Sequence, residues 1–155
     1  MKSTVTSSEM FKYIMLFTLL FAAFLALAIT YNKVYKQKNE TISIIEKYEG
    51  VTNKSLKIIN NYLLSSNYKT KGQCEVGEYG MKSLEDTSLE SVSDRSQKYY
   101  YCLSDYVVLN ENIDRIHYKV KLFFKFNIPF IGELFTFRIT GESKGVQYYD
   151  TDQRL

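Results

Sequence analysis

The chain is poor in the residues on which most catalytic and metal sites depend. It contains one histidine and two cysteines, and these three residues make no spacing typical of a zinc site. It also has no glycine-rich phosphate loop, no nucleophile elbow and no histidine paired with a serine or cysteine. Only a pair of carboxylates is left as a catalytic option. We therefore expect a protein that is not an enzyme and that binds no metal or cofactor.

An excess of charge of one sign is also missing. The formal net charge of +3 is too small to indicate a nucleic-acid partner, because nucleic-acid-binding domains gather a marked basic excess on one face. A chain of 155 residues with 45% hydrophobic and 24% charged side chains has the composition of one folded domain. We expect no nucleic acid among its partners.

A long uncharged segment lies near the N-terminus. Residues 13–30 read YIMLFTLLFAAFLALAIT, and as a helix they would extend about 27 Å at about 1.5 Å per residue, close to the thickness of a hydrocarbon core. Lys12 and Tyr13 mark one edge, and Tyr31 and Lys33 mark the other, where aromatic and cationic side chains favour the headgroup level. The segment predicts a single-pass protein of the cell membrane, in contact with membrane lipid.

A cleaved signal peptide is the alternative interpretation of the same segment. In Ala26-Leu27-Ala28 the two alanines supply the small residues that a cleavage site needs. Against cleavage, no polar or helix-breaking stretch precedes that site, and the helical pattern continues through Tyr31. We expect the segment to be retained, whereas cleavage would leave a secreted ligand-binding domain.

Flanking charges do not decide the orientation. Lys2, Lys12 and the terminal amine precede the segment, while Lys33, Lys36 and Lys38 follow it, so the positive charges nearly balance.

The two cysteines favour one orientation. Cys74 and Cys102 both follow the apolar segment, and an isolated pair in a small exported domain is typical of a disulfide. The bridge would close a loop of about 28 residues, worth ~3 to 4 kcal/mol in the chain-entropy model. Two buried, reduced thiols in a cytosolic domain are the alternative. We expect a disulfide and an extracytoplasmic C-terminal domain.

Two helical stretches follow the apolar segment. Residues 31–49 lack glycine and proline and show apolar residues at helical spacings, until Gly50 supplies a stop or kink. A second helix is expected after Thr52 or Asn53, with an apolar stripe that must cover another element: Leu56, Ile59 and Leu63.

The second half of the chain indicates strands. Residues 65–97 are polar and read as a surface excursion with one short helix near 83–92. Residues 118–126 alternate large apolar side chains with mostly cationic ones, which favours a half-buried strand with its charged face in solvent. Residues 135–142 alternate likewise, and residues 99–109 form a third β-rich run.

These elements predict an α+β fold. The transmembrane helix extends into an amphipathic helix, which packs on a small antiparallel sheet of about three strands. The expected boundaries are an N-terminal tail at 1–12, the transmembrane helix at 13–30, the helical stalk and covering helix at 31–66, a surface loop region at 67–97 and an antiparallel meander at 98–155.

The connection between the last two strands is unusually apolar. FNIPFIGELF, residues 126–135, contains the only proline and yet is rich in large apolar side chains. Connections normally run over the surface, so Phe130 and Ile131 are expected to be exposed and to contact a partner subunit or the membrane. The alternative is that they fold back over the end of the core.

The layout resembles that of pilin-like proteins, in particular TadE-like minor pilins. The polar SSEMFK leads into the apolar segment, a helical extension and a three-stranded sheet. The resemblance implies a non-catalytic, single-pass subunit of a bacterial surface assembly, packed through its apolar helix and able to form homo-oligomers. It places Glu9 where the family has a glutamate used in assembly. No glycine precedes Glu9, so processing by a prepilin peptidase is not implied.

The order of elements also resembles the inner-membrane scaffold subunit of type IV secretion or conjugation channels. That resemblance implies one N-terminal span, a helix and a curved antiparallel sheet, with docking through the outer domain. Both resemblances imply protein partners in an envelope complex.

Overall fold

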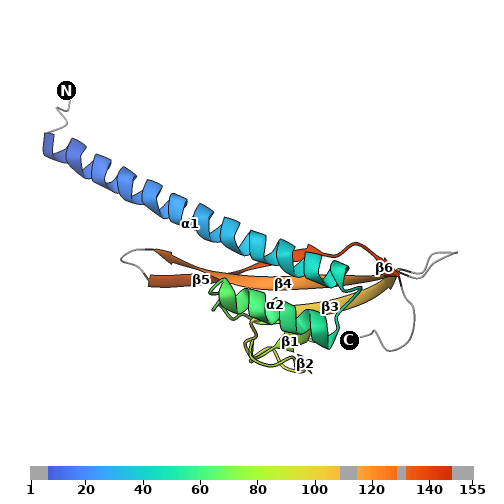
Figure 1. The fold of residues 1–155 in the computed structure, drawn as a ribbon. Helices are drawn as coiled ribbons and strands as arrows, with labels where there is room; N and C mark the ends of the chain where they lie inside the picture. The colour runs from blue at the N-terminus through green and yellow to red at the C-terminus, as the bar shows by residue number, and fades with distance from the viewer. Residues whose placement is uncertain (1–6, 109–114, 129–131, 148–155) are drawn as a thin grey trace.

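The computed structural model describes residues 7–108, 115–128 and 132–147, and its fold is α+β, as expected. Two helices precede one antiparallel sheet (Figure 1). The helices are α1 (Ser7–Lys47) and α2 (Asn53–Ser65). The strands are β1 (Tyr79–Met81), β2 (Leu89–Ser91), β3 (Tyr101–Val108), β4 (Arg115–Ile128), β5 (Gly132–Glu142) and β6 (Val146–Gln147).

The sheet is larger than the predicted meander. Its order is β2-β1-β3-β4-β5, and β6 pairs with β4 beyond the end of β5. Strands β3, β4 and β5 correspond to the three predicted strands, while β1 and β2 form a short antiparallel pair within the predicted loop region. The prediction of a short helix near 83–92 was wrong, because that stretch contains β2 and is not helical.

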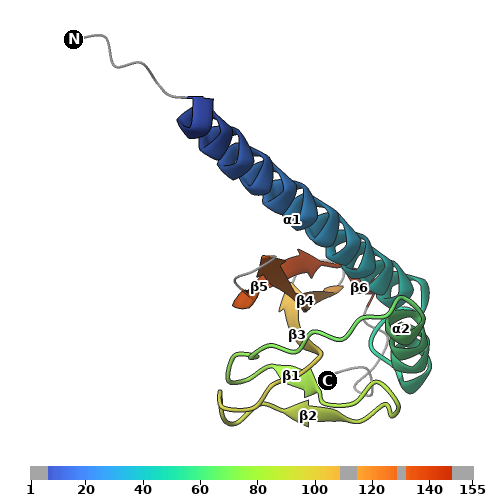
Figure 2. The same ribbon diagram turned by 90° about the vertical axis from the view of Figure 1, so that its left-hand side faces the viewer.

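Helix α1 continues from the apolar segment into the core without a break. Its N-terminal half projects away from the sheet, and its C-terminal half lies across it beside α2 (Figures 1 and 2). The buried residues of α1 recur every three or four positions, which is the spacing of one helix face: Val34, Gln37, Lys38, Thr41, Ile44 and Ile45. The C-terminal half of α1 therefore covers the sheet together with α2.

The turn between the helices has the predicted stop at Gly50 and a predicted cap at Thr52. Glu49 and Gly50 adopt positive φ angles of 55° and 135°, and the Gly50 N–H donates to the carbonyl of Ile45 at 2.9 Å. Thr52 then caps α2, because its side chain accepts from the Ser55 N–H while the Ser55 hydroxyl accepts from the Thr52 N–H.

The main core lies between the helices and one face of the sheet. Side chains at alternate positions of β3 and β4 point into it, including Leu103, Tyr118, Val120 and Leu122, which are fully buried. The hydroxyl of Tyr101 donates to Asn60 Oδ1 on α2 at 2.8 Å, so this fully buried hydroxyl is satisfied. Burial raises the pKa of Tyr101.

The opposite face of the sheet carries a second, smaller cluster. It consists of Cys74, Val92, Tyr99, Cys102 and Phe123. The segment between α2 and β3 therefore packs against the sheet instead of forming a solvated excursion.

Candidate functional site

The N-terminal half of α1 presents large apolar side chains around its whole circumference. Between Met10 and Ile29 thirteen of them are 47% to 70% exposed: Met10, Phe11, Tyr13, Ile14, Met15, Leu16, Phe17, Leu19, Leu20, Phe21, Phe24, Leu25 and Ile29. The helix is long and apolar enough to cross a membrane, although a signal sequence can have the same length and composition. Glu9 lies exposed in its first turn.

An apolar groove lies where this half of α1 meets the sheet. We call it the α1–β5 groove; it has a volume of about 400 Å³ and is lined by Phe24, Leu27, Ala28, Tyr31, Phe124 and Phe137. The rings of Phe124 and Phe137 stack with centroids 5.2 Å apart, and Leu27 packs against the main core. The apolar segment and the domain therefore share one continuous apolar surface.

A basic cleft lies beside the groove. We give this name to a space of about 590 Å³ lined by Lys71, Gly72, Gln73, Lys98, Phe123, Thr136, Phe137 and Arg138. Phe137 lines both spaces, whereas the three cations belong to the cleft alone. No acidic residue is among the described residues that line it.

Two of the three cations in the cleft have a protein partner. Arg138 donates to Glu75 at 2.8 Å, and the Lys71 ammonium donates to the carbonyl of Lys82 at 3.2 Å while lying 4.3 Å from the centre of the Tyr100 ring. These contacts leave donors of both cations free, since a guanidinium has five and an ammonium three.

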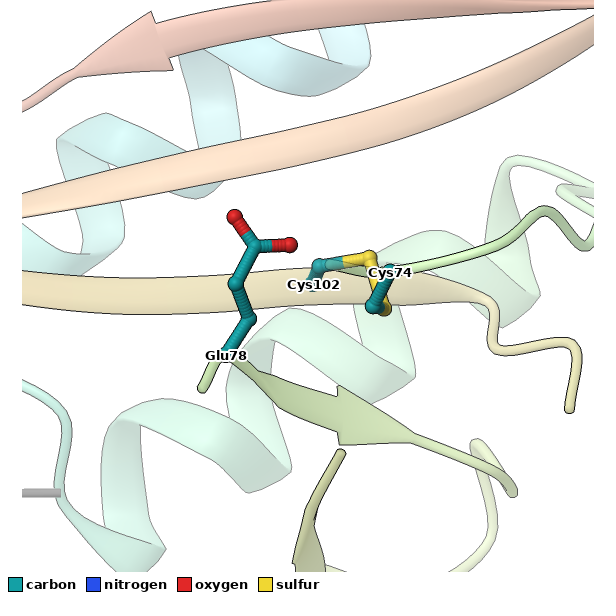
Figure 3. A group of neighbouring side chains, drawn as sticks. All are labelled: Cys74, Glu78 and Cys102. Atoms are coloured by element: carbon teal, nitrogen blue, oxygen red, sulfur yellow. A yellow bond between two sulfur atoms is a disulfide. The ribbon is translucent and has the colours of Figure 1, made fainter. Parts of the chain in front are cut away.

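The predicted disulfide is present. Cys74 and Cys102 are bonded, with their Cα atoms 5.7 Å apart, so the segment before β1 is fastened to β3. Figure 3 shows Glu78 beside the bridge. The Glu78 carboxylate accepts from the ammonium of Lys121 at 2.5 Å, and both side chains are nearly buried, at 10% and 9% exposure. Lys121 was expected to face solvent, but this segment covers it.

Two further charge pairs continue outward from the buried one. Glu75 lies 3.2 Å from the Lys121 ammonium and also accepts from Arg138. The hydrogen bond from Lys121, followed by its positive charge, lowers the pKa of the Glu75 carboxyl.

This cluster fits a cross-link better than a metal site. The ligand atoms of Cys74, Glu78 and Cys102 lie within 4.8 Å of one another, which is close enough to share an ion. Both sulfurs are consumed in the bridge, however, and a thiolate is the form that binds metal. The carboxylate is already paired with Lys121.

The histidine is engaged in the fold. His117 Nδ1 lies 3.2 Å from the carbonyl oxygen of Ser143, and its ring stacks on Tyr106 with centroids 5.2 Å apart. These contacts give the ring a structural role at the end of the sheet remote from the hairpin between β4 and β5.

The structure brings together some of the predicted site residues and leaves others apart. Cys74 and Cys102 are joined, and Glu9 lies alone at the exposed end of α1. Phe130 and Ile131 lie outside the described residues, so their expected contact stays a prediction. In their described parts β4 ends at Ile128 and β5 begins at Gly132, at the end of the sheet that lies on the same side as the N-terminal half of α1 (Figure 1).

Comparison with known proteins adds no functional assignment. No protein-family model, curated protein or solved structure matches this chain.

Proposed function

We propose that the chain is a single-pass membrane protein and a non-catalytic subunit of a bacterial envelope assembly, pilin-like in its layout, with its C-terminal domain outside the cytoplasm. One observation carries the proposal. The same helix exposes apolar side chains on every side in its N-terminal half and forms part of the domain core in its C-terminal half. A helix that is apolar all round requires an apolar surrounding, which lipid or neighbouring helices supply.

The groove supports retention of the apolar segment. Phe24 and Leu27 precede the candidate cleavage site at Ala28, yet both line the groove, and Leu27 packs on the main core. Cleavage after Ala28 would therefore remove side chains that contribute to the folded domain.

The disulfide supports the proposed orientation. Structural disulfides persist in extracytoplasmic compartments and are rare in the cytosol. Because both cysteines are nearly fully buried, at 2% and 1% exposure, their bridge has the character of a structural bond.

Expression of the full chain in a bacterial host tests anchoring and sidedness. We expect a protein of 18.2 kDa that stays in the membrane pellet after alkaline carbonate extraction. In intact cells an impermeant maleimide should label it only after reduction and mild denaturation. A shorter chain in the soluble fraction would contradict anchoring, and labelling that requires cell lysis would contradict the orientation.

Glu9 tests the pilin-like mode of assembly, which follows from the resemblance. Glu9→Gln is expected to reduce self-association in membranes at least several-fold, as measured by chemical crosslinking. The control Glu85→Gln removes a carboxylate from an exposed loop far from the helix and should leave self-association unchanged. Crosslinked oligomers that persist unchanged in Glu9→Gln would favour the alternative, a scaffold that associates through its outer domain.

A further inference from the structure

Phe137 lies where two surfaces of opposite character meet. It stands on β5, an edge strand of the sheet, and it lines both the apolar α1–β5 groove and the basic cleft. The next residue along β5, Arg138, belongs to the cleft only. Because neighbouring side chains of a strand point to opposite faces, one face of β5 borders the apolar space and the other carries the charge.

The groove lies at the level where the apolar segment ends. Phe24, Leu27 and Ala28 belong to residues 13–30, and Tyr31 follows immediately. Phe24 and Tyr31 are separated by about 10 Å along the helix at about 1.5 Å per residue, which is enough to cross one interfacial layer of a bilayer, about 5–8 Å thick. With α1 across the membrane, the groove therefore spans the boundary between acyl chains and headgroups.

Charge decides between the two candidate occupants of the groove. The apolar segment of a second copy would fill the apolar space, but it carries no charge that could pair with the three neighbouring cations. A phospholipid with a net negative headgroup matches both halves, because its chain is apolar and its phosphate prefers arginine and lysine. The groove is also continuous with the part of α1 that lipid would surround.

We propose that an anionic phospholipid of the leaflet facing the domain binds here, with an acyl chain in the α1–β5 groove and its phosphate at Lys71, Lys98 and Arg138. This inference rests on the proposed membrane anchoring. It gives the domain a fixed orientation relative to the bilayer, in which the edge of β5 faces the lipid headgroups.

The chain has no tryptophan, so one introduced indole reports from a single place. Phe137→Trp places it in the groove. Tyr106→Trp is the matched control, because Tyr106 has the same 42% exposure as Phe137. Tyr106 is paired with His117 on β4, about 23 Å along that strand from Phe124 at about 3.3 Å per residue.

Each variant is reconstituted as the full chain at one copy per lipid nanodisc, which removes the second copy as an occupant. The discs contain phosphatidylcholine and a fixed fraction of phosphatidylglycerol brominated on its acyl chains near the carbonyl. We expect quenching of the Phe137→Trp emission to exceed that of Tyr106→Trp at least two-fold, together with a blue-shifted emission maximum. Equal quenching of the two variants would overturn the proposal.

A second comparison tests the headgroup. Brominated phosphatidylglycerol is replaced by the same fraction of brominated phosphatidylcholine in an unbrominated background of phosphatidylcholine. We expect the anionic lipid to quench Phe137→Trp at least two-fold more strongly. The pair Lys71→Gln and Lys98→Gln should abolish that preference, whereas Lys54→Gln and Lys57→Gln on α2 should preserve it. This control also removes two charges and one cation–π contact, since Lys54 lies over the ring of Tyr48.

The outcomes separate this inference from the proposed function. Preference for neither headgroup, or loss of the preference in both lysine pairs, would overturn the anionic lipid site. A chain that stays in the disc with both indoles equally quenched would overturn the site while leaving membrane anchoring intact. A chain that fails to enter the discs would overturn both.

Discussion

The ring of Tyr31 meets the ring of Phe124 edge-on, with their centroids 6.1 Å apart. Tyr31 is the first residue after the apolar segment, and Phe124 lies on the longest strand of the sheet. Aromatic pairs in this arrangement contribute about 0.5–1.5 kcal/mol beyond the area they bury. The contact therefore ties the end of the apolar segment directly to the folded domain.

Reduction of the disulfide should destabilise the domain. Cys74 and Cys102 are separated by 28 residues, and a loop of that size predicts a loss of ~3–4 kcal/mol in the free energy of unfolding. Urea titration of the full chain in detergent, with and without reductant, measures the difference. The double variant Cys74→Ala and Cys102→Ala should unfold near the reduced wild type without reductant. An unfolding midpoint unchanged by reduction would contradict this expectation.

The pair formed by Lys121 and Glu78 should show strong non-additivity. Lys121→Met leaves a buried carboxylate unpaired and should cost ~3–5 kcal/mol in the free energy of unfolding. Adding Glu78→Gln removes that charge while its amide oxygen can still accept from the Glu75 N–H. The double variant should therefore be more stable than Lys121→Met alone. Chemical denaturation measures the cycle, and simple addition of the two single losses would count against a coupled pair.

A side chain at position 141 should destabilise the fold because α1 passes close to β5 there. A Cβ at this position would lie 2.6 Å from Ile42 Cδ1 and 2.8 Å from Lys38 Cδ. Gly141→Ala is expected to cost about 1–3 kcal/mol in the free energy of unfolding. Ile42→Val removes the Cδ1 methyl, so the double variant should recover part of that loss. If Ile42→Val gives no recovery, the close approach of these two atoms is not the cause.

Stability should fall at acidic pH through Glu75. Lys121 and Arg138 lower the pKa of its carboxyl from the ordinary value of 4.5. A carboxyl with a lower pKa in the folded chain stabilises the fold above pH 4.5, and this contribution is lost as the pH falls through the folded-state pKa. Glu75→Gln should therefore flatten the decrease in thermal unfolding temperature below pH 4.5, relative to Glu85→Gln. Identical pH profiles for the two variants would refute the assignment.

Local patterns made much of the fold predictable. The apolar segment, the stop at Gly50, the cap at Thr52 and the alternation along 118–126 each act within a few residues. The expected helices, turn, cap and strand are present, although the predicted solvent face of that strand is covered at Lys121 and Phe123. The disulfide was predictable because only one pairing exists for two cysteines.

Long-range packing was not predictable from those patterns. Residues 89–91 within that stretch form β2 because β1, itself paired with β3, offers a partner strand, not because of their own propensity. Lys121 is buried because the segment fastened by the disulfide lies over it. One signal was available: Phe123 interrupts the cationic face of its strand, and its burial at 3% exposure shows that this face is covered. The groove arises from residues about a hundred positions apart and has no local signature.

The uninterrupted course of α1 has a mechanical consequence. A domain joined to an apolar segment by a flexible linker can rotate freely relative to it, but here the helix that carries the segment also forms part of the domain core. A tilt, rotation or vertical shift of the N-terminal half of α1 is therefore transmitted to the sheet as a rigid-body movement. The contact between the rings of Tyr31 and Phe124 couples the two parts directly.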